Sequence, residues 1–339
     1  MNNPLVSICI PTYNGSAYLA QCIESAIQQT YANIEILIVD DKSTDNTCKL
    51  IEKYAASDSR IKLIRNEKNL GLVGNWNRCM DLAKGEWIKF LFQDDYFDSD
   101  CISAMVESIS DGDKIITSGR RLVFEESIDE ASKNYSLNET LTFSKLGIHE
   151  EKPIALTPEQ ITKFTVDHIC MNFIGEPTTV MFRKEMAGEL GYFNPDLVQI
   201  CDLEYFLRIA TRYGMKYIPQ ALTYFRAGAH SGSASSANIS KRQFSMLHID
   251  PIITTHLLLY NAHFASFRKA LSGRQKMKLN LFFRVRTYEA YKSAMNSNKE
   301  NSGRFEAACN KYPEINKHKH GNVFIKLVLL FIKQKRAFA

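Results

Sequence analysis

Short apolar runs separated by stretches of helical periodicity mark the first hundred residues. The runs are continuous, as expected for strands buried on both faces, and occupy residues 5–10, 34–39, 61–64 and 87–92. Apolar residues at helical spacing predict helices that begin near residues 14–16, continue over 50–54 and span 70–83. Alternating strands and helices with short links predict an α/β fold, in which helices cover both faces of a mainly parallel sheet.

The pattern is less regular after residue 100. Strands are expected at 115–117, 122–124 and 178–182, and helices over 158–168 and from residue 202. Residues 125–155 are polar and predict a surface excursion, and the small polar residues 227–238 predict a loop. From residue 240 onward the pattern is helical. We therefore expect one domain over residues 1–240, with halves 1–98 and 99–240, and a helical extension over residues 241–339.

Charge divides between these two parts of the chain. Residues 1–240 hold 23 Lys and Arg against 32 Asp and Glu, a net charge of −9, whereas residues 241–339 hold 19 against 5, a net charge of +14. A basic extension on an acidic body points to anionic lipid headgroups or to nucleic acid. The alternative is a solvated helical face. No nucleic-acid recognition motif is present, which together with the acidic body argues against nucleic acid.

The cysteines indicate the compartment. All eight are scattered without a CxxC pair, which is typical of free thiols in a reducing environment rather than of a zinc site or a disulfide framework. The first residues lack a basic region followed by a long apolar run, and no stretch reaches the ~18 apolar residues needed to cross a bilayer. We therefore expect a cytoplasmic protein without a signal peptide.

Polar and aromatic side chains follow three of the predicted strands. Tyr13 follows the first strand, Asp40 ends the second, and Asp94 and Asp95 follow the fourth. Ligands of open parallel sheets bind at this edge. Tyr13 is suited to stacking on a base, Asp40 to accepting a hydrogen bond from a base, and the acidic pair to holding a divalent cation. Each has an ordinary alternative: packing for Tyr13, a helix cap for Asp40, and a turn for the acidic pair.

Four segments carry a resemblance to a known family. VSICIPTYNG, IEILIVDDKSTDNT, NLGLVGNWN and FLFQDD resemble, in order and spacing, family 2 of the inverting glycosyltransferases, with its Rossmann-like type A fold. The resemblance covers roughly residues 5–240. It implies a nucleoside-diphosphate sugar donor, preferably a UDP-sugar, with Mn or Mg as cofactor. It also implies donor contacts from Pro11, Tyr13, Asp40, Asp41, Gly71, Asn75, Asp94 and His230, and metal ligation by Asp94 and Asp95.

The resemblance also points to a catalytic base. Inversion at a sugar carbon requires one group to take the proton of the acceptor hydroxyl. Asp202, at the start of a predicted helix, matches the family's catalytic acid, with Glu204 as the second candidate and a helix cap as the ordinary alternative. Two residues depart from the family pattern. Phe92 replaces the first carboxylate of the acidic motif, and Cys201 stands where a Glu often precedes the base.

Three further residues are expected around the site. Glu176, in the segment before a predicted strand, resembles a family position on the acceptor side, and the alternative is a surface turn. His230 resembles a position in a loop over the diphosphate, and the alternative is an exposed loop imidazole. Arg226 is placed to meet a phosphate.

The end of the chain predicts contact with a membrane surface. Residues 323–332 are apolar except for Lys326, and Lys333, Lys335 and Arg336 follow. The run is too short to span a bilayer but suits a helix lying in the interface of an anionic membrane. The alternative is a last helix packed on the core. Family members often act on lipid-linked acceptors, which fits a peripheral position at the inner face of the membrane.

The resemblance thus implies inverting transfer of a sugar to the hydroxyl of a saccharide or lipid-linked saccharide, in surface polysaccharide or glycolipid assembly. One rival is a non-catalytic nucleotide-sugar-binding scaffold of the same fold, which the Phe92 and Cys201 departures leave open. The other is a nucleotidyltransferase, which usually carries a basic Gly-rich phosphate loop after its first strand. The segment TYNGSAYLA has no basic residue there.

Overall fold

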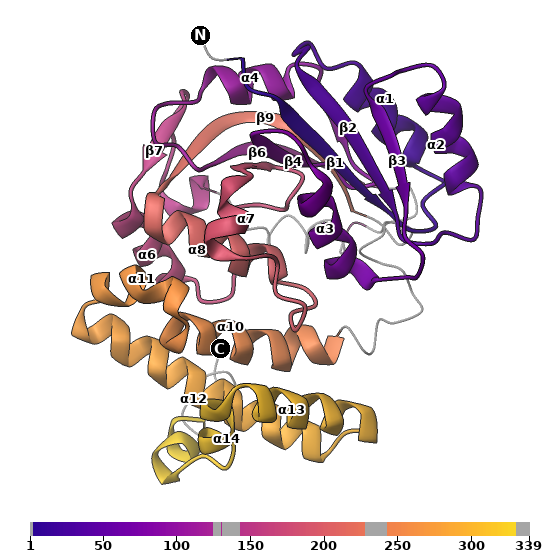
Figure 1. Cartoon of the computed structure of the whole chain (residues 1–339). Coiled ribbons are helices and arrows are strands. Elements are labelled where there is room, and N and C mark those ends of the chain that lie inside the picture. The colour runs from indigo at the N-terminus through magenta and orange to yellow at the C-terminus, as the bar shows by residue number, and fades with distance from the viewer. Residues whose placement is uncertain (1–2, 125–129, 131–142, 228–242, 330–339) are drawn as a thin grey trace. The chain divides into compact units, whose positions relative to one another are not determined.

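The computed structural model describes residues 3–124, 130, 143–227 and 243–329 (Figure 1). Its chain forms two compact units, which are treated separately. The first comprises residues 1–161, 172–195 and 202–237, and the second comprises residues 162–171, 196–201 and 238–339. The predicted boundary at residue 240 lies close to the last of these divisions. Two short segments, 162–171 and 196–201, also belong to the helical unit.

The first unit is built on a mixed sheet of nine strands in the described part of the chain. The strands are β1 (Val6–Thr12), β2 (Ile34–Asp40), β3 (Ile61–Arg65), β4 (Trp87–Phe90), β5 (Tyr96–Phe97), β6 (Ile115–Phe124), β7 (Ile154–Leu156), β8 (Val180–Arg183) and β9 (Met215–Ala227). Their order is β3-β2-β1-β4-β8-β6-β9-β5, with β7 also paired to β9. Pairing is parallel from β3 to β4, whereas β8 runs antiparallel to both β4 and β6. The α/β prediction is confirmed.

Helices cover both faces of this sheet. The helices of the first unit are α1 (Leu19–Ile27), α2 (Thr47–Ala55), α3 (Gly71–Leu82), α4 (Cys101–Glu107), α7 (Glu185–Leu190) and, except for its first residue, α8 (Cys201–Tyr213), with a 3-10 turn, η1, at Ser144–Leu146. Helix α6 (Pro158–Asp167) begins in the first unit and continues into the second. Side chains of α1 such as Ile23 bury against Ile8 and Ile36 on one face. On the other face, the thiol of Cys9 points at the Cys79 carbonyl of α3. Both faces of these strands are thus buried away from water, as their continuous apolar runs predict.

The first helix begins later than predicted. It starts at Leu19 rather than near residues 14–16, because Asn14 has a φ of 46° and its amide bonds to the Ser43 hydroxyl. Residues 13–16 therefore form a tip after β1 instead of a helical turn. This tip is part of the candidate site.

Two strands differ from the prediction as well. The expected strands at 115–117 and 122–124 are one strand, β6, and its partner β9 was not expected. The register of the β6–β9 ladder shifts around Gly119. A Cβ on Gly119 would lie 2.8 Å from the Pro219 carbonyl oxygen, so the lack of a side chain allows the close approach. Pro219 and the shift break the alternation that normally reveals a strand.

The second unit is helical. Its elements are η4 (Ser245–Ile249), α10 (Asp250–Tyr260), η5 (Ala262–Phe264), α11 (Ala265–Ala270), α12 (Gly273–Met295), α13 (Lys299–Lys311) and α14 (Pro313–His318), and residues 323–329 are also helical. Phe264, Phe267 and Phe283 are completely buried in it. A capping box at Ser272 and Gln275 starts the long α12. Among the described residues, no helix combines the length and apolarity that a bilayer crossing needs.

Candidate active site

The tips of β1 and β2 are joined by hydrogen bonds. Asp40, which ends β2, is 1% exposed, and its carboxylate accepts the Ser43 amide at 2.9 Å and the Thr12 hydroxyl at 3.3 Å. The Asn14 amide donates to the Ser43 hydroxyl at 2.9 Å. The Asp40 carboxylate and Ser43 thus hold the backbone that follows β1 in place. Pro11, also predicted, is buried within β1.

Gln93 connects the tip of β1 to the acidic motif after β4. Its amide oxygen accepts the Tyr13 amide at 2.9 Å, and its amide nitrogen donates to the Tyr13 carbonyl at 3.3 Å. Gly15 leaves room for this contact, because a Cβ there would lie 2.2 Å from the Gln93 oxygen. The Tyr13 ring is 49% exposed, so a base has access to it. Sequence reasoning missed Gln93, which lies inside the FQDD motif but is not itself a charged group.

Asp41 organises the start of α3. Its carboxylate is 2% exposed and accepts the Asn66 side-chain amide at 2.9 Å and the backbone amides of Leu70 and Gly71 at 2.8 and 2.9 Å. Asn66 also bonds to Asn75, whose own amide donates to the Val39 carbonyl at 3.0 Å. The positive φ of Gly71, 75°, allows its amide to turn toward Asp41. The predicted residues Asp41, Gly71 and Asn75 therefore form one interlocked cluster beside the strand tips.

Replacement of Asp41 by Asn is expected to lower stability by about 1–3 kcal/mol, because one acceptor oxygen becomes an NH2 group that faces a buried N–H donor. Urea unfolding monitored by circular dichroism measures this change. Asp111→Asn, the same exchange at an exposed position, provides the control and should leave the midpoint unchanged. An unchanged midpoint for Asp41→Asn would contradict the assigned role.

The two acids of the metal motif differ in environment. Asp95 is 2% exposed, and its oxygens accept the Thr178 hydroxyl at 2.6 Å and the Arg226 amide at 3.0 Å. Burial, reinforced by the neighbouring Asp94 carboxylate, raises the pKa of Asp95. Asp94 is only half-buried. Asp94 is therefore the more accessible metal-ligand candidate, while the geometry gives Asp95 a structural task at the end of β9.

Arg226 is held in place by protein groups. Its guanidinium donates to the Asp94 carbonyl at 3.0 Å and to the Gln21 side chain at 2.7 Å, and it lies over the Tyr18 ring at 4.4 Å. The end of β9 is thus anchored to the acidic motif. His230 lies outside the described residues.

The described residues fit a cation that is shared with a substrate. They contain no group of three or more His, Cys, Asp or Glu arranged to hold a metal ion by themselves. One or two carboxylates together with substrate phosphates are a common ligand set for Mg²⁺. Asp94 supplies a carboxylate of this kind.

Asp202 lies in the first turn of α8, where sequence reasoning expected the base. It is 6% exposed, and its carboxylate accepts the Leu203 amide at 2.8 Å and the Asn172 side-chain amide at 3.2 Å. Burial, assisted by the negative charge of Glu176, raises the pKa of Asp202 to about 7. A carboxylate that titrates near neutral pH is well matched to proton transfer.

Glu204, the second candidate, is engaged elsewhere. It is 1% exposed, and its carboxylate forms a buried ion pair with Arg208, to which the Arg208 Nε–H donates at 2.8 Å. Arg208 in turn donates to the carbonyls of Leu190 and Tyr192 at 2.8 and 3.0 Å. This pair links α8 to the chain after α7. The geometry therefore favours Asp202 as the base.

Glu176 lies in the segment before β8 and forms an ion pair with Arg120. Its negative charge contributes to the raised pKa of both Asp95 and Asp202. Asn172 braces the same turn by bonding to the Gly175 backbone at 3.0 and 3.1 Å. Arg120 and Asn172 were not predicted, since no local motif marks a residue whose partner is distant in sequence. Hydrogen bonds thus join the tips of β1, β2 and β4, and Asn172 joins the start of α8 to the turn at Gly175.

The two departures from the family pattern fill apolar positions. Phe92 stacks on Trp76 with ring centres 4.8 Å apart, and Trp76 also contacts Phe193. Cys201 is 1% exposed. Both positions are thus filled by packing side chains rather than by acids.

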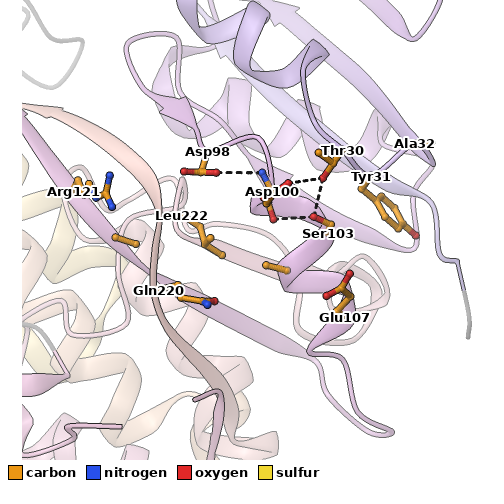
Figure 2. A pocket seen from close by; sticks show the side chains of 12 residues that line it. Thr30, Tyr31, Ala32, Asp98, Asp100, Ser103, Glu107, Arg121, Gln220 and Leu222 are labelled. Carbon is orange, nitrogen blue, oxygen red and sulfur yellow. Dashed lines mark hydrogen bonds between the residues drawn. The ribbon is translucent and has the colours of Figure 1, made fainter. Parts of the chain in front are cut away.

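A polar hollow of about 980 Å³ lies elsewhere on the first unit (Figure 2). It is lined by Thr30, Tyr31, Ala32, Asp98, Asp100, Ser103, Ala104, Glu107, Arg121, Gln220, Ala221 and Leu222. No predicted site residue is among them. Thr30 and Asp100 bond to each other at 3.0 Å across its wall. The exposed Tyr13 and the buried Asp202, whose pKa is raised to about 7, both lie outside this hollow, so we do not assign the predicted site to it.

Comparison with known proteins agrees with this geometry. The model of the family described as glycosyl transferase family 2 matches residues 7–174. An uncharacterised protein of Mycobacterium tuberculosis is 30% identical over 255 residues, which cover 74% of this chain and 77% of that protein. The glycosyltransferase GlyG of Streptococcus pneumoniae is 28% identical over 56% of this chain and 60% of its own length. TuaG of Bacillus subtilis, provisionally named a teichuronic acid biosynthesis glycosyltransferase, is 28% identical over 70% of this chain and 85% of its own length.

Solved structures share the fold. TarS of S. aureus matches with a TM-score of 0.58 at 16% identity, over 91% of this chain and 49% of that chain. The mannosyltransferase PcManGT of Pyrobaculum calidifontis matches with a TM-score of 0.54 at 15% identity, over 97% of this chain and 87% of that chain. At these identities the likeness establishes the fold. Together with the sequence matches, it places the chain in glycosyl transferase family 2.

Proposed function

We propose that this protein transfers a sugar from a nucleoside-diphosphate sugar to an acceptor hydroxyl with inversion of the anomeric carbon. The observation that carries the proposal is the placement of the buried Asp202 in the first turn of α8, where its carboxylate accepts a hydrogen bond from Asn172, which also bonds to the Gly175 backbone next to Glu176. Burial in addition raises the pKa of Asp202 to about 7. The acceptor oxygen bonds to the anomeric carbon as the bond to the diphosphate oxygen breaks. Asp202 takes the hydroxyl proton, and the electron pair of the broken bond leaves with the diphosphate.

The donor side is assigned to the strand tips. The exposed ring of Tyr13 stacks on the base. Asp40 holds the backbone at Ser43, and Asp41, Gly71 and Asn75 hold the start of α3 beside the strand tips. Asp94 would hold a divalent cation, Mn²⁺ or Mg²⁺, which would supply positive charge to neutralise the diphosphate leaving group. We prefer a UDP-sugar. The complex of TarS 1–349 with UDP-GlcNAc supports this choice of base. The complex of PcManGT with GDP-Man and Mn²⁺ supports a nucleoside-diphosphate sugar together with a cation, with guanosine as the alternative base.

The acceptor is a saccharide or a lipid-linked saccharide of a surface polysaccharide. The name of TuaG, which matches most of this chain, supports this class. The experiment is a thermal-shift panel of UDP-, GDP- and dTDP-sugars with and without Mn²⁺, followed by measurement of nucleotide release with and without candidate saccharide acceptors. Transfer or donor hydrolysis supports an enzyme. Stabilisation without turnover under all conditions would instead indicate a binding scaffold.

We further propose that the C-terminal helix places the protein at an anionic membrane surface, on the cytoplasmic side. Val323, Phe324 and Leu327 are 73%, 58% and 58% exposed, whereas Ile325 is buried at 2%. The helical residues 323–329 thus turn apolar side chains to solvent while one side chain anchors them. The remaining apolar residues and Lys333, Lys335 and Arg336 lie outside the described residues.

Replacing Val323, Phe324 and Leu327 together by Ser is expected to reduce vesicle binding about tenfold or more, because each apolar side chain contributes about 1.5 kcal/mol or more when buried. Co-sedimentation with vesicles of phosphatidylglycerol and phosphatidylcholine measures the binding. Met277→Ser, at a 68% exposed apolar side chain on α12, serves as the control. Equal sedimentation of the triple variant and the wild type would refute the membrane assignment.

A further inference from the structure

A buried carboxylate of the helical unit holds an irregular loop by its backbone. Asp250, the first residue of α10, has no exposed surface. Its carboxylate accepts the amide of Val198 at 3.1 Å, of Gln199 at 2.6 Å and of Ile200 at 3.3 Å. Three successive N–H groups that converge on one anion form a backbone nest. The loop 198–200 therefore takes its shape from a side chain some fifty residues later in the chain.

The same unit also holds the beginning of this loop. Asp196 accepts the Tyr312 hydroxyl at 2.5 Å and pairs with Lys311 at 2.5 Å. Residues 196–201, Asp250, Lys311 and Tyr312 all belong to the helical unit. The segment is thus fixed at both ends by the C-terminal extension, although the matched family region, residues 7–174, contains none of these residues.

The chain leads from this loop directly into the proposed base. Ile200 is followed by Cys201, where α8 begins, and then by Asp202. The first turn of a helix has no preceding turn to support it, so its orientation depends on the segment that enters it. Asp202 is therefore joined through Cys201 alone to the backbone that Asp250 holds.

A carboxylate at the fully buried position 250 needs a physical reason. A fully buried carboxylate is costly unless its oxygens are satisfied, and burial raises the pKa of Asp250 to about 6. The three loop amides, together with the positive charge of Arg304, act in the opposite direction. Arg304 itself donates to the Ser245 hydroxyl at 2.7 Å. The polar contacts of Asp250 are thus directed at the loop.

We propose that Asp250 is a positioning residue for sugar transfer, which fixes the entry to α8 so that Asp202 faces the acceptor hydroxyl. This inference rests on the proposed function of Asp202. It makes the helical extension a working part of the transferase. Catalytic groups that shift by about 1 Å lose about 100-fold in rate, so loosening this anchor should be visible in turnover.

The first test needs no variant and no substrate. Hydrogen exchange of the full-length wild type should show that the amides of Val198, Gln199 and Ile200 are protected, although they lie outside regular structure. Rapid exchange of all three would overturn the anchor even if Asp250→Asn fails to fold. Because this result does not depend on turnover, it remains informative if the wild type transfers no sugar and the proposed function fails.

The second test measures turnover with the donor selected by the nucleotide-sugar panel, and UDP binding by calorimetry. Asp250→Asn should lower kcat about 10- to 100-fold with UDP affinity within about twofold of wild type, and it should move the acid limb of the kcat–pH profile to lower pH as Asp202 becomes hydrated. Asp250→Glu, which keeps the charge, should recover part of kcat. Glu306→Gln, which also converts a carboxylate to an amide but at an exposed site on α13, should leave kcat unchanged. An Asp250→Asn protein with wild-type kcat and an unmoved acid limb would overturn the proposal.

Discussion

Asp202→Asn is expected to reduce the rate of sugar transfer by about 10²–10⁴-fold while donor binding is retained, because the amide cannot accept the proton of the acceptor hydroxyl. The shape of the site should persist, since the Asn oxygen can still accept one of the two bonds from Leu203 and Asn172. Steady-state turnover and calorimetric donor binding measure the two effects separately. Glu185→Gln, at an exposed acid in the first turn of α7, is the matched control. Undiminished turnover of Asp202→Asn would remove the assignment.

The same residue predicts the pH dependence of the wild type. Because the pKa of Asp202 is raised to about 7, transfer should increase as pH rises through 7 and the base loses its proton. The folded state binds this proton more tightly than the unfolded chain, whose carboxyl has the ordinary pKa of 3.8. The stabilising contribution is therefore complete below about pH 4 and is lost as pH rises from about 4 to about 7. The melting temperature of Asp202→Asn relative to wild type should thus increase between about pH 4 and about pH 7 and change little above that.

The sequence was most informative where local pattern decides structure. Strands β1, β2 and β4 are buried on both faces, so their residues form continuous apolar runs, and the polar residue that follows each run marks the edge of the sheet. Tyr13, Asp40 and Asp94 could therefore be located before any coordinates were known. Asp202 was proposed from the resemblance to the family, and its position at the start of a predicted helix agrees with the first turn of α8.

Contacts between distant residues could not be found in this way. Gln93 forms a hydrogen bond with Tyr13, which lies 80 positions away in the sequence, and Asp95 forms one with Arg226, which lies 131 positions away. Neither pairing leaves a periodic signal in either segment. Asp95 shows the consequence, because the doublet with Asp94 predicts two metal ligands, whereas the fold encloses one of the two acids. Strand β9 was missed for a related reason: Pro219 and the register shift opposite it interrupt the alternation on which strand prediction depends.

Asp94 is more exposed than Asp95, so their Asn variants should differ in how UDP binding depends on a metal ion. Asp94→Asn should lower UDP affinity in the presence of Mn²⁺ about 10- to 100-fold, to the level that wild type shows in EDTA, because a neutral amide is a weak ligand for a hard cation that must also neutralise a diphosphate. Asp95→Asn should behave differently. Its oxygens are already used by Thr178 and Arg226, so this variant should keep the Mn²⁺ dependence of UDP binding and lose stability instead.

Calorimetric titration of UDP into wild type, Asp94→Asn and Asp95→Asn, each with Mn²⁺ and with EDTA, separates these outcomes. Thermal melting of the three proteins provides the matched stability measurement. If the cation is held by Asp94, its requirement disappears in Asp94→Asn alone, because the carboxylate that remains is 2% exposed and cannot take over the ligand position without breaking two hydrogen bonds. If the requirement disappears in Asp95→Asn and persists in Asp94→Asn, the metal assignment must be exchanged between the two acids. Wild-type binding that is indifferent to EDTA would show that the diphosphate is neutralised by protein cations instead.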